Sequence, residues 1–437
     1  MKLRLIPGSV TAPQGFTAGA VFADLKRIGT GKGSNKGQKR DLAVIVSSVP
    51  AVAAGMFTTN QVCAAPVKLC LENIRGKSAR AIVVNSGNAN ACTGRQGLAD
   101  AQRTAVLAAR ALKVSPGEIL VASTGRIGVN LPMDHVERGI TAATGLLSDS
   151  TAAAGQVAEA IMTSDTRPKQ IAVEILIGGK PVRLGGVCKG AGMIQPGMSA
   201  RGTRPAALHA TMLCFVTTDA AVDRAALQDA LQESVALSFN RITVDGDMST
   251  NDTVLVLANG QAGNARLRPG QPGWADFKSA LNHVCLELAR MIVRDGEGVS
   301  RFVTVRVEGA ENALSADAAA RSVANSALVK TSWHGGDPNW GRIIDALGYS
   351  SAKVVEEKVD IAYSAPGSKK LLHSLRRGQP TRTSFKSLCA VVASREFDLH
   401  IDLNLGRGSA VMYAADLTED YVDFNKGDVS DPASLGG

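Results

Sequence analysis

Short apolar runs alternate along this chain with longer stretches in which apolar residues recur every three or four positions. The short runs are rich in valine, isoleucine and leucine, and they predict buried strands at 42–47, 79–85, 119–123, 253–258 and 302–309. The longer stretches predict helices at 98–112, 148–162, 223–238 and 274–294. Two further runs within 171–184 flank Gly178-Gly179, which predicts a β-hairpin. Elements that alternate in this way predict an α/β fold, in which helices pack in layers on sheets.

The predicted helix at 223–238 has the clearest start signal in the chain. Asp223 is a favourable N-cap, because its carboxylate can accept hydrogen bonds from the first free backbone N–H groups. Apolar residues then follow at helical spacing, beginning with Ala226 and Leu227. No fixed-period repeat interrupts this pattern, so we expect ordinary domains and no solenoid.

Length and composition limit the class of protein. The chain has 437 residues, which exceeds a comfortable single core and predicts two or three domains. Hydrophobic residues make up 45% and aromatic residues only 4%, so small side chains fill much of the interior, as in layered α/β packing. No apolar run reaches the roughly 18 residues of a membrane span, and the apolar stretch after Met1 is too short for a signal peptide. These features favour a cytoplasmic protein without a membrane partner.

The cysteines and aspartates give little support for a metal site. Seven cysteines lie singly, without a Cys-x-x-Cys pair or a histidine at metal-ligand spacing, so we expect reduced thiols. Asp245, Asp247 and Asp252 invite a calcium interpretation. However, the ligand order of an EF-hand is absent and no glutamate follows at the required offset. We therefore predict no metal.

The net charge of +9 raises the question of nucleic-acid binding. Part of the excess lies in 31–40, where glycine, serine and asparagine surround four basic residues, a composition typical of a solvated surface loop. Aromatic platforms interleaved with arginine and lysine are missing, as is a recognisable helix-turn-helix. Nucleic-acid binding is therefore the weaker interpretation, and small anionic substrates suit a basic protein equally well.

The junction Ala210-Thr211, which opens the apolar run 212–216, has two interpretations. Taken alone, it is typical of the start of a buried strand. The alternative is a self-cleavage site. A threonine hydroxyl is a weak nucleophile without a base, but a cut before Thr211 frees an α-amino group, of pKa about 8, that can serve as the base within the same residue.

Three glycine-containing turns carry further candidate chemistry, although each also reads as plain loop geometry. At Ser123-Thr124-Gly125, a glycine allows close backbone approach and a threonine hydroxyl can donate, as an oxyanion hole requires. Lys189 stands beside glycines, where an ammonium group can clamp a carboxylate if it is not simply solvated. Glu297 stands between two glycines and can act as a counter-charge to an amine.

Together these segments resemble the ornithine acetyltransferase family, also called glutamate N-acetyltransferase. The resemblance extends from Val10 to Asn425, through the segments 10–16, 84–94, 122–128, 161–169, 189–196, 210–219, 245–252, 295–298, 334–342 and 416–425. It implies a layered α/β architecture of the self-processing N-terminal-nucleophile type, with a smaller α/β C-terminal domain.

The resemblance also implies roles for individual residues. Cleavage between Ala210 and Thr211 leaves Thr211 as the nucleophile, and Thr124 and Gly125 form the oxyanion hole. The implied substrate contacts are Thr163, Lys189, Thr211, Glu297, Asn425 and Ser430, with Glu297 facing the amino group of the substrate. The implied products are an α chain, 1–210, and a β chain, 211–437, in which 211–305 completes the catalytic core and 306–437 forms the C-terminal domain. The resemblance further implies that two copies of each chain assemble as a heterotetramer.

The activity implied by the resemblance is ping-pong acetyl transfer from N-acetylornithine to glutamate through an acetyl-Thr211 intermediate, a step of arginine biosynthesis. No metal or redox cofactor is implied, and some members also accept acetyl-CoA, which the sequence does not decide. The alternative within enzymes is a self-processing aminopeptidase or amidase, in which water takes the acyl group. Such relatives generally use serine, so Thr211 disfavours that alternative.

The chain departs from the family pattern near two of these residues. Residues 199–209 are inserted directly before the Ala210-Thr211 junction. They can either delay self-cleavage or remain as a tail on the first chain after it, and we favour the tail, because loops lengthen at little thermodynamic cost. Seven residues follow Ser430, whereas the family usually ends beside that hydroxyl. The basic segment 31–40 also interrupts the match, far from the motifs.

Overall fold

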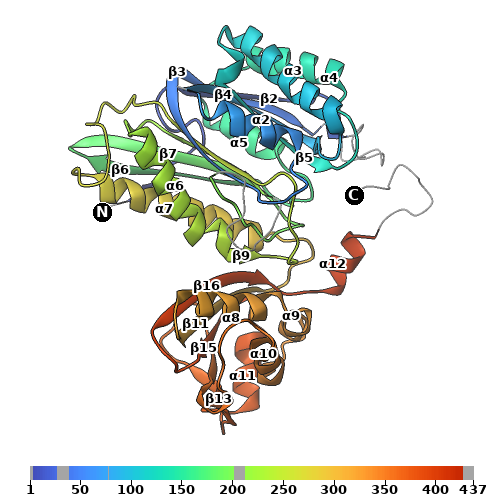
Figure 1. The fold of residues 1–437 in the computed structure, drawn as a ribbon, viewed down its shortest axis with the longest axis vertical. Coiled ribbons are helices and arrows are strands. Elements are labelled where there is room, and N and C mark those ends of the chain that lie inside the picture. The colour runs from blue at the N-terminus through green and yellow to red at the C-terminus, as the bar shows by residue number, and fades with distance from the viewer. Residues whose placement is uncertain (1–2, 27–38, 77, 201–211, 427–437) are drawn as a thin grey trace. The chain divides into compact units, whose positions relative to one another are not determined.

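The computed structural model describes residues 3–26, 39–76, 78–200 and 212–426. These residues form two compact units (Figure 1). Unit 1 contains the described residues up to Asn240 together with Asp247–Ile292. Unit 2 contains Arg241–Gly246 and Val293–Lys426. The candidate site residues are divided between the two units.

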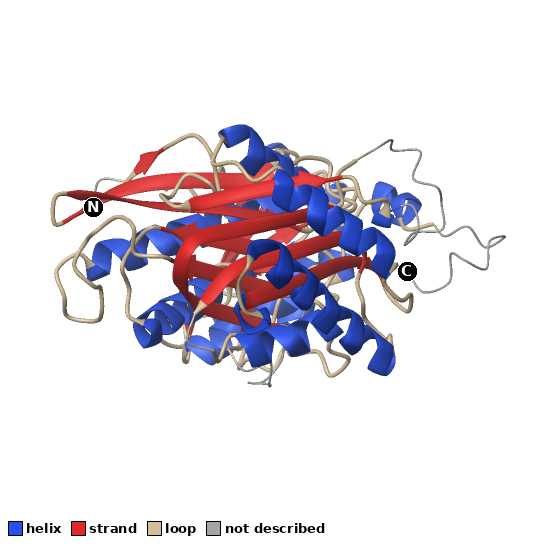
Figure 2. Cartoon of the chain, turned by 90° about the horizontal axis from the view of Figure 1, so that it is seen from above, coloured by secondary structure: helices blue, strands red, loops and turns tan. Residues whose placement is uncertain are grey.

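Unit 1 is built on a nine-stranded sheet whose order is β1-β6-β7-β8-β10-β3-β4-β5, with β2 paired to β3. Figure 2 shows the long strands running side by side. The strands are β1 (Arg4–Leu5), β2 (Phe16–Val21), β3 (Leu42–Phe57), β4 (Ala79–Asn88), β5 (Ile119–Arg126), β6 (Lys169–Ile177), β7 (Lys180–Lys189), β8 (Leu213–Thr218) and β10 (Thr253–Ala258). The helices are α2 (Ala65–Asn73), α3 (Gly94–Leu112), α4 (Met133–Gly145), α5 (Thr151–Ala160), α6 (Arg224–Leu237) and α7 (Trp274–Val293).

The long strand β3 joins two layers of this sheet. Its first part pairs with β2 and β4, and its last part, from Val52 to Phe57, pairs with β10. In the first part, Leu42 and Val44 face the core under α3 and α4, whereas Ala43 and Ile45 face a second core shared with β8 and β10. Alternate residues thus bury both faces, which explains why the first part of the strand, 42–46, is apolar without interruption.

The far side of the β7–β8–β10 layer packs on α6 and α7. A side chain at Gly186 of β7 would meet Leu288 and Val284 of α7, so the helix lies close against the strand. Gln228 of α6 exchanges hydrogen bonds with the backbone of Gly55 in β3. Unit 1 is therefore layered, with α3 and α4 on one outer side, α6 and α7 on the other, and two sheet layers between them, whose shared core also takes in α2 and α5 (Figure 1). The expected layered α/β class is confirmed.

Unit 2 is built on a seven-stranded sheet of order β14-β13-β12-β15-β11-β16-β9. Its strands are β9 (Ile242–Thr243), β11 (Phe302–Ala310), β12 (Asp360–Ser364), β13 (Leu372–Arg376), β14 (Gln379–Pro380), β15 (Glu396–Asp402) and β16 (Gly408–Ala415). Its helices are α8 (Ala313–Asn325), α9 (Ala327–His334), α10 (Trp340–Gly348), α11 (Phe385–Val392) and α12 (Glu419–Phe424). One apolar core, rich in valine and alanine, lies between the sheet and α8 to α11.

Several local predictions are confirmed. The predicted hairpin is β6–β7, and Gly178 and Gly179 at its turn both have positive φ, which glycine adopts without strain. Asp223 caps α6 by accepting from Ala225 N at 3.0 Å. The predicted strand at 253–258 is β10. Helix α4 was not predicted, although its buried residues Val136, Gly139, Ile140 and Ala143 recur at helical spacing.

The described helices include none that is long and apolar enough to cross a membrane. All seven cysteines lie in the described part and are free; four of them are buried. Burial raises the pKa of the Cys70 and Cys285 thiols to about 12, so these side chains act as small apolar groups.

Candidate active site

The predicted oxyanion turn lies where the parallel strands β4 and β5 end side by side. Gly125 pairs with Gly87, and both have positive φ, +130° and +97°. A Cβ on Gly125 would lie 2.3 Å from the carbonyl carbon of Gly87, so only glycine allows this approach. The neighbouring Thr124 is 1% exposed. The sequence thus places a buried threonine hydroxyl beside a closely packed glycine backbone.

Buried amide side chains hold these strand ends in place. Asn251 Nδ2 donates to the carbonyl oxygens of Ser123, at 2.8 Å, and Ala89, at 2.7 Å. Ser123 Oγ donates to Asn85 Oδ1 at 2.6 Å. The sequence reasoning assigned no role to Asn251 or Asn85. The signal that could have found them is the presence of asparagines in otherwise apolar strand ends, because a buried amide must find partners.

Lys189, the last residue of β7, meets the oxyanion turn. Its ammonium group donates to Thr124 Oγ1 at 3.3 Å, and the residue is 3% exposed. Two residues that are 65 positions apart in the sequence are thereby brought into contact. A buried ammonium group beside a hydroxyl can hold an anionic substrate group at the place where the hydroxyl donates.

A buried carboxylate, Asp165, lies beside Lys189. Its Oδ1 accepts from Lys169 Nζ at 2.5 Å and from Gly190 N at 2.8 Å, and its Oδ2 accepts from Thr163 N at 3.0 Å. Burial by itself would raise the pKa of Asp165, but the ammonium groups of Lys189 and Lys169, with the Gly190 hydrogen bond, outweigh burial and hold the pKa well below its usual range. Asp165 is therefore ionised.

Thr163, the remaining predicted contact in unit 1, is half-buried and is tied to this carboxylate through its backbone. The structure thus brings together Thr124, Gly125, Thr163 and Lys189, and it adds Asp165 and Lys169; we call these six residues the lysine cluster. The sequence reasoning missed Asp165 and Lys169. Their separation of four positions, in a segment that leaves a helix and enters a strand, is the signal that could have indicated a local ion pair.

The predicted nucleophile lies just outside the described residues. Ala210 and Thr211 fall in the segment 201–211, as does most of the insertion 199–209. Directly after it, Met212 N donates to Asp252 Oδ1, and Met212 O accepts from Thr253 N at 3.0 Å. Directly before it, Ser199 pairs with Phe57 in an isolated antiparallel bridge. The described residues on either side of this segment, Ser199 and Met212, are therefore held by hydrogen bonds to other residues of unit 1.

The aspartates considered for calcium have other surroundings. Asp252 accepts from the backbone of Met212, and Asp245, in unit 2, accepts from the Tyr421 hydroxyl at 3.3 Å. Within the ranges that the structure describes, no group of three or more histidine, cysteine, aspartate or glutamate side chains is arranged to hold a metal ion.

In unit 2, the structure brings together Glu297 and Asn425. Asn425 Nδ2 donates to Glu297 Oε2 at 3.0 Å. The turn that carries Glu297 is fixed to the start of α12, because Thr418 Oγ1 donates to Gly298 O at 2.7 Å. Gly298 has φ +65°, and a Cβ there would lie 2.3 Å from Tyr421 N. Glu297 is half-buried and Asn425 is exposed, and Ser430 lies outside the described residues.

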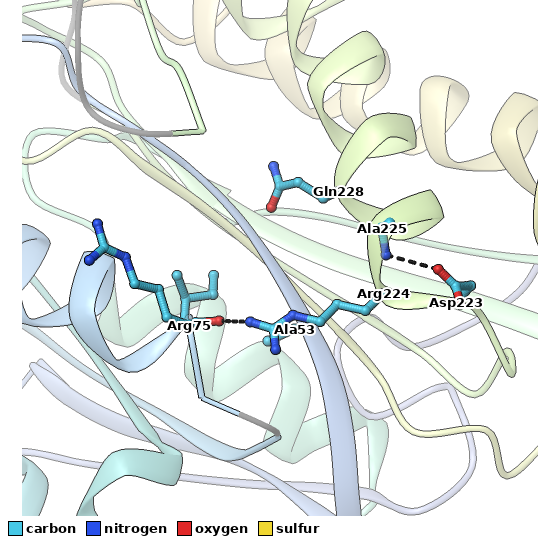
Figure 3. A pocket seen from close by; sticks show the side chains of 7 residues that line it. Ala53, Arg75, Asp223, Arg224, Ala225 and Gln228 are labelled. Carbon is cyan, nitrogen blue, oxygen red and sulfur yellow. Dashed lines mark hydrogen bonds between the residues drawn. The ribbon is translucent and has the colours of Figure 1, made fainter.

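A hollow of about 480 Å³ in unit 1 contains none of the predicted site residues (Figure 3). It lies between the end of α2 and the start of α6, and it is lined by Ala53, Ile74, Arg75, Asp223, Arg224, Ala225 and Gln228. Arg224 crosses it and donates to the carbonyl oxygens of Gly76, at 2.5 Å, and Ile74. In this hollow, Arg224 thus connects the start of α6 to the turn that follows α2.

The basic segment 31–40 lies mostly outside the described residues, which begin again at 39. Arg40 forms an ion pair with Glu159 at 2.7 Å, and its carbonyl oxygen accepts from Lys26 Nζ at 2.8 Å. The described end of this segment therefore makes internal contacts in unit 1.

Comparison with known proteins gives consistent matches along the chain. A model described as the ArgJ family matches residues 27–427. The arginine biosynthesis bifunctional protein ArgJ of Symbiobacterium thermophilum is 48% identical over 420 residues, which cover 96% of this chain and 98% of that protein. The glutamate N-acetyltransferase of Methanocaldococcus jannaschii is 43% identical over 428 residues, covering 97% and 99%. A solved structure, ornithine acetyltransferase complexed with ornithine from Mycobacterium tuberculosis, is 37% identical, with a TM-score of 0.41, over 45% of this chain and 100% of that chain.

Proposed function

The chain belongs to the ArgJ family, and on that premise we propose how its own residues move an acetyl group from N-acetylornithine to glutamate. The protein is an acyltransferase of arginine biosynthesis, and its substrates are N-acetylated and free amino acids. The observation that carries the proposed mechanism is the buried contact between Lys189 and Thr124 at the strand end that Gly125 closes.

The first step is self-cleavage. Thr211 Oγ attacks the carbonyl carbon of Ala210, and the hydroxyl proton passes to the departing amide nitrogen, which leaves an ester between the two residues. Water then hydrolyses this ester. Ala210 ends in a carboxylate, and Thr211 regains its hydroxyl and gains a free α-amino group.

The second step is acetyl transfer. The α-amino group of Thr211 takes the hydroxyl proton while Oγ attacks the acetyl carbonyl of N-acetylornithine, and the proton passes on to the departing amine of ornithine. Glutamate then attacks the acetyl-Thr211 ester with its own amine, which forms N-acetylglutamate and restores Thr211. Thr124 and the Gly125 backbone stabilise the oxyanion of both tetrahedral intermediates.

The remaining residues bind the substrate. Lys189 pairs with the substrate carboxylate, Thr163 contacts the substrate from the neighbouring loop, and Glu297 pairs with the amino group. Asn425 and Ser430 complete the contacts from the C-terminal segment. The hydrogen bond between Asn425 and Glu297 supports the joint assignment of these two residues.

The two chains, 1–210 and 211–437, remain associated after cleavage in this proposal, with 211–305 in the catalytic core and 306–437 as the C-terminal domain, although unit 2 of the structure already includes Val293–Lys426. The support is the position of β8, which begins two residues after Thr211 and pairs with β7 of the first chain on one side and with β10 on the other. A ladder of backbone hydrogen bonds thus crosses the boundary between the chains. We propose a heterotetramer of two such pairs, in the cytoplasm.

The proposed reaction uses no metal or redox cofactor, since the nucleophile, the base and the oxyanion donors all come from the chain. Acetyl-CoA is a second candidate donor, because the Symbiobacterium relative is named bifunctional. Its thioester would acetylate Thr211 in the same first half-reaction.

The experiment that tests this proposal combines mass spectrometry with an acetyl-transfer assay. The purified parent protein should give two fragments, the second of which begins with Thr211, and it should form N-acetylglutamate from N-acetylornithine and glutamate. The Thr211→Ala variant should remain whole and inactive. Thr141→Ala, at an exposed threonine of α4, is the matched control and should behave like the parent. A parent protein that stays whole yet transfers acetyl groups would remove the free-amine base from the mechanism.

A further inference from the structure

The carboxylate of Asp165 takes no part in the mechanism above, although it lies at the centre of the lysine cluster. Its side chain is fully buried, and the side chain of its partner Lys169 is 1% exposed. A buried ion pair seldom increases stability over apolar side chains of the same size, because desolvation of both charges offsets their attraction. The pair therefore calls for a role beyond stability.

The geometry of Asp165 connects two segments that carry proposed substrate contacts. One carboxylate oxygen accepts from the backbone of Thr163, and the other accepts from the backbone of Gly190, the residue after Lys189. These segments come from different parts of unit 1: the first follows α5, and the second follows β7. A single side chain thus sets the spacing between Thr163 and Lys189.

The charges around Asp165 are equally specific. Lys169 begins β6, and Lys189 ends the adjacent strand β7, where Lys169 pairs with Cys188, the neighbour of Lys189. The two ammonium groups and one carboxylate leave the cluster with one net positive charge. Lys26 also interacts with Asp165, and burial lowers the pKa of Lys26 to about 8, with Asp41, Glu159 and Asp165 opposing this effect and Lys39 adding to it.

We propose that Asp165 is a positioning residue for substrate binding: its two backbone hydrogen bonds fix the Thr163 and Lys189 segments, and its carboxylate offsets the charges of both lysines, so that Lys189 is held in place for the substrate carboxylate. The inference rests on the proposed function, because Lys189 and Thr163 meet a substrate only there. Lys169 Nζ forms a direct ion pair with Asp165 Oδ1 at 2.5 Å, and in this inference it serves as the second partner that keeps Asp165 ionised. N-acetylornithine and glutamate both carry an α-carboxylate, so both should depend on this balance.

The test compares three variants in steady-state kinetics, with rates expressed per cleaved chain. Asp165→Asn removes the negative charge that interacts with both buried ammonium groups and replaces one of the two acceptor oxygens by a donor. Lys169→Met leaves Asp165 to neutralise Lys189 alone. Each single variant should raise the KM for both substrates by about 10- to 100-fold and change kcat less. The double variant Asp165→Asn/Lys169→Met has the same net charge as the parent but still lacks one of the two backbone acceptors, so it should regain the part of the affinity that was lost through the change of charge.

Asp149→Asn, at an exposed aspartate before α5, is the matched control and should leave KM unchanged. A double variant that binds no better than the weaker single variant, or single variants that melt earlier with an unchanged KM, would show a merely structural ion pair and overturn the inference. If Asp165→Asn does not fold, the comparison of Lys169→Met with the double variant tests the inference. Charge balance predicts weaker substrate binding in Lys169→Met and a partial recovery in the double variant.

Different results would contradict the proposed function and the positioning role of Asp165. A parent protein that does not transfer acetyl groups from N-acetylornithine to glutamate contradicts the proposed function before any variant is compared. A parent that transfers them, but whose KM does not respond to the charge of Asp165 and Lys169, contradicts only the positioning role.

Discussion

The two units bury positive charge in different ways. In unit 1, Lys169 and Lys189 share the buried carboxylate of Asp165, whose pKa they hold well below its usual range after outweighing burial. In unit 2, the buried Lys330 donates to the carbonyl oxygens of Ala415 and Ala324, and burial lowers its pKa to about 8 despite the carboxylates of Asp245 and Asp416. The buried lysines of unit 1 are kept with a direct counter-charge, whereas the lysine of unit 2 that satisfies carbonyl groups is close to losing its proton.

The candidate substrate contacts show the same contrast. Thr124 and Lys189 are almost fully buried in unit 1, and their positions are fixed by surrounding strands. Glu297 is half-buried and Asn425 is exposed in unit 2, and a short helix carries the latter. Rigid, buried donors suit transition-state stabilisation, whereas exposed groups suit recognition of the substrate. We therefore expect substitution of the proposed oxyanion donor Thr124 in unit 1 to lower kcat and substitutions of the proposed contacts in unit 2 to raise KM.

The largest expected effect concerns Thr124. Thr124→Ala removes one oxyanion donor but leaves Lys189 in place, so kcat should fall by about 10²- to 10³-fold while KM changes little. The measurement is steady-state transfer from N-acetylornithine to glutamate with fully cleaved protein. A loss confined to affinity would place Thr124 among the binding residues and remove the contrast between the units.

The next effect concerns the stability of unit 2. The folded pKa of Lys330, about 8, lies below its ordinary value of 10.5, so the unfolded chain holds the proton more tightly between these values. The free energy of unfolding should therefore rise with pH across this range, by about 3 kcal/mol from this residue. Lys330→Met should lack this contribution.

The check is urea denaturation of the parent and of Lys330→Met at several pH values between about 8 and 10.5, followed through the unfolding of unit 2. Only the difference between the two pH curves is compared, because other groups titrate in the same range. Parallel curves would mean that the folded protein holds this proton as tightly as the unfolded chain, and the contrast with the lysine cluster would disappear.

Glu297→Gln should have a smaller effect that appears in binding. The amide keeps the shape of the side chain but removes a charge-assisted partner of the substrate amino group, worth about 1.5–3 kcal/mol. KM should rise by a corresponding factor and kcat should change little. If kcat falls as far as in Thr124→Ala with KM unchanged, Glu297 acts in the transition state and the division between the units is wrong.

The smallest effect is expected for Asn425. Asn425→Ala removes the hydrogen bond to Glu297 from an exposed side chain, so the loss of binding free energy should be about 0.5–1.5 kcal/mol. In a double-mutant cycle with Glu297→Gln, the double variant should lose less binding free energy than the two single variants lose together, because both substitutions remove parts of one contact. Full additivity would show that the two residues bind the substrate independently.

Local features of the fold followed directly from the sequence. The apolar run at 253–258 is β10, the paired glycines at 178–179 turn the β6–β7 hairpin, and Asp223 caps α6. Each depends on residues that are neighbours in the chain, so periodicity and turn chemistry are sufficient to predict it. Thr124, Gly125, Lys189 and Glu297 could be singled out for a related reason, since each stands in a glycine-containing turn at the end of a predicted element.

Tertiary structure alone decided which of these turns meet. The short strand β9 joins the sheet of unit 2, although unit 1 holds the residues on both sides of its segment, and no local pattern indicates this. The contact between Lys189 and Thr124, and the link that Asp165 makes between Thr163 and Gly190, depend on the pairing of strands far apart in the sequence. A residue such as Asp165 has the same local sequence signal whether it is solvated or buried. Its role becomes visible only once the fold removes water and leaves the lysines and backbone N–H groups as its partners.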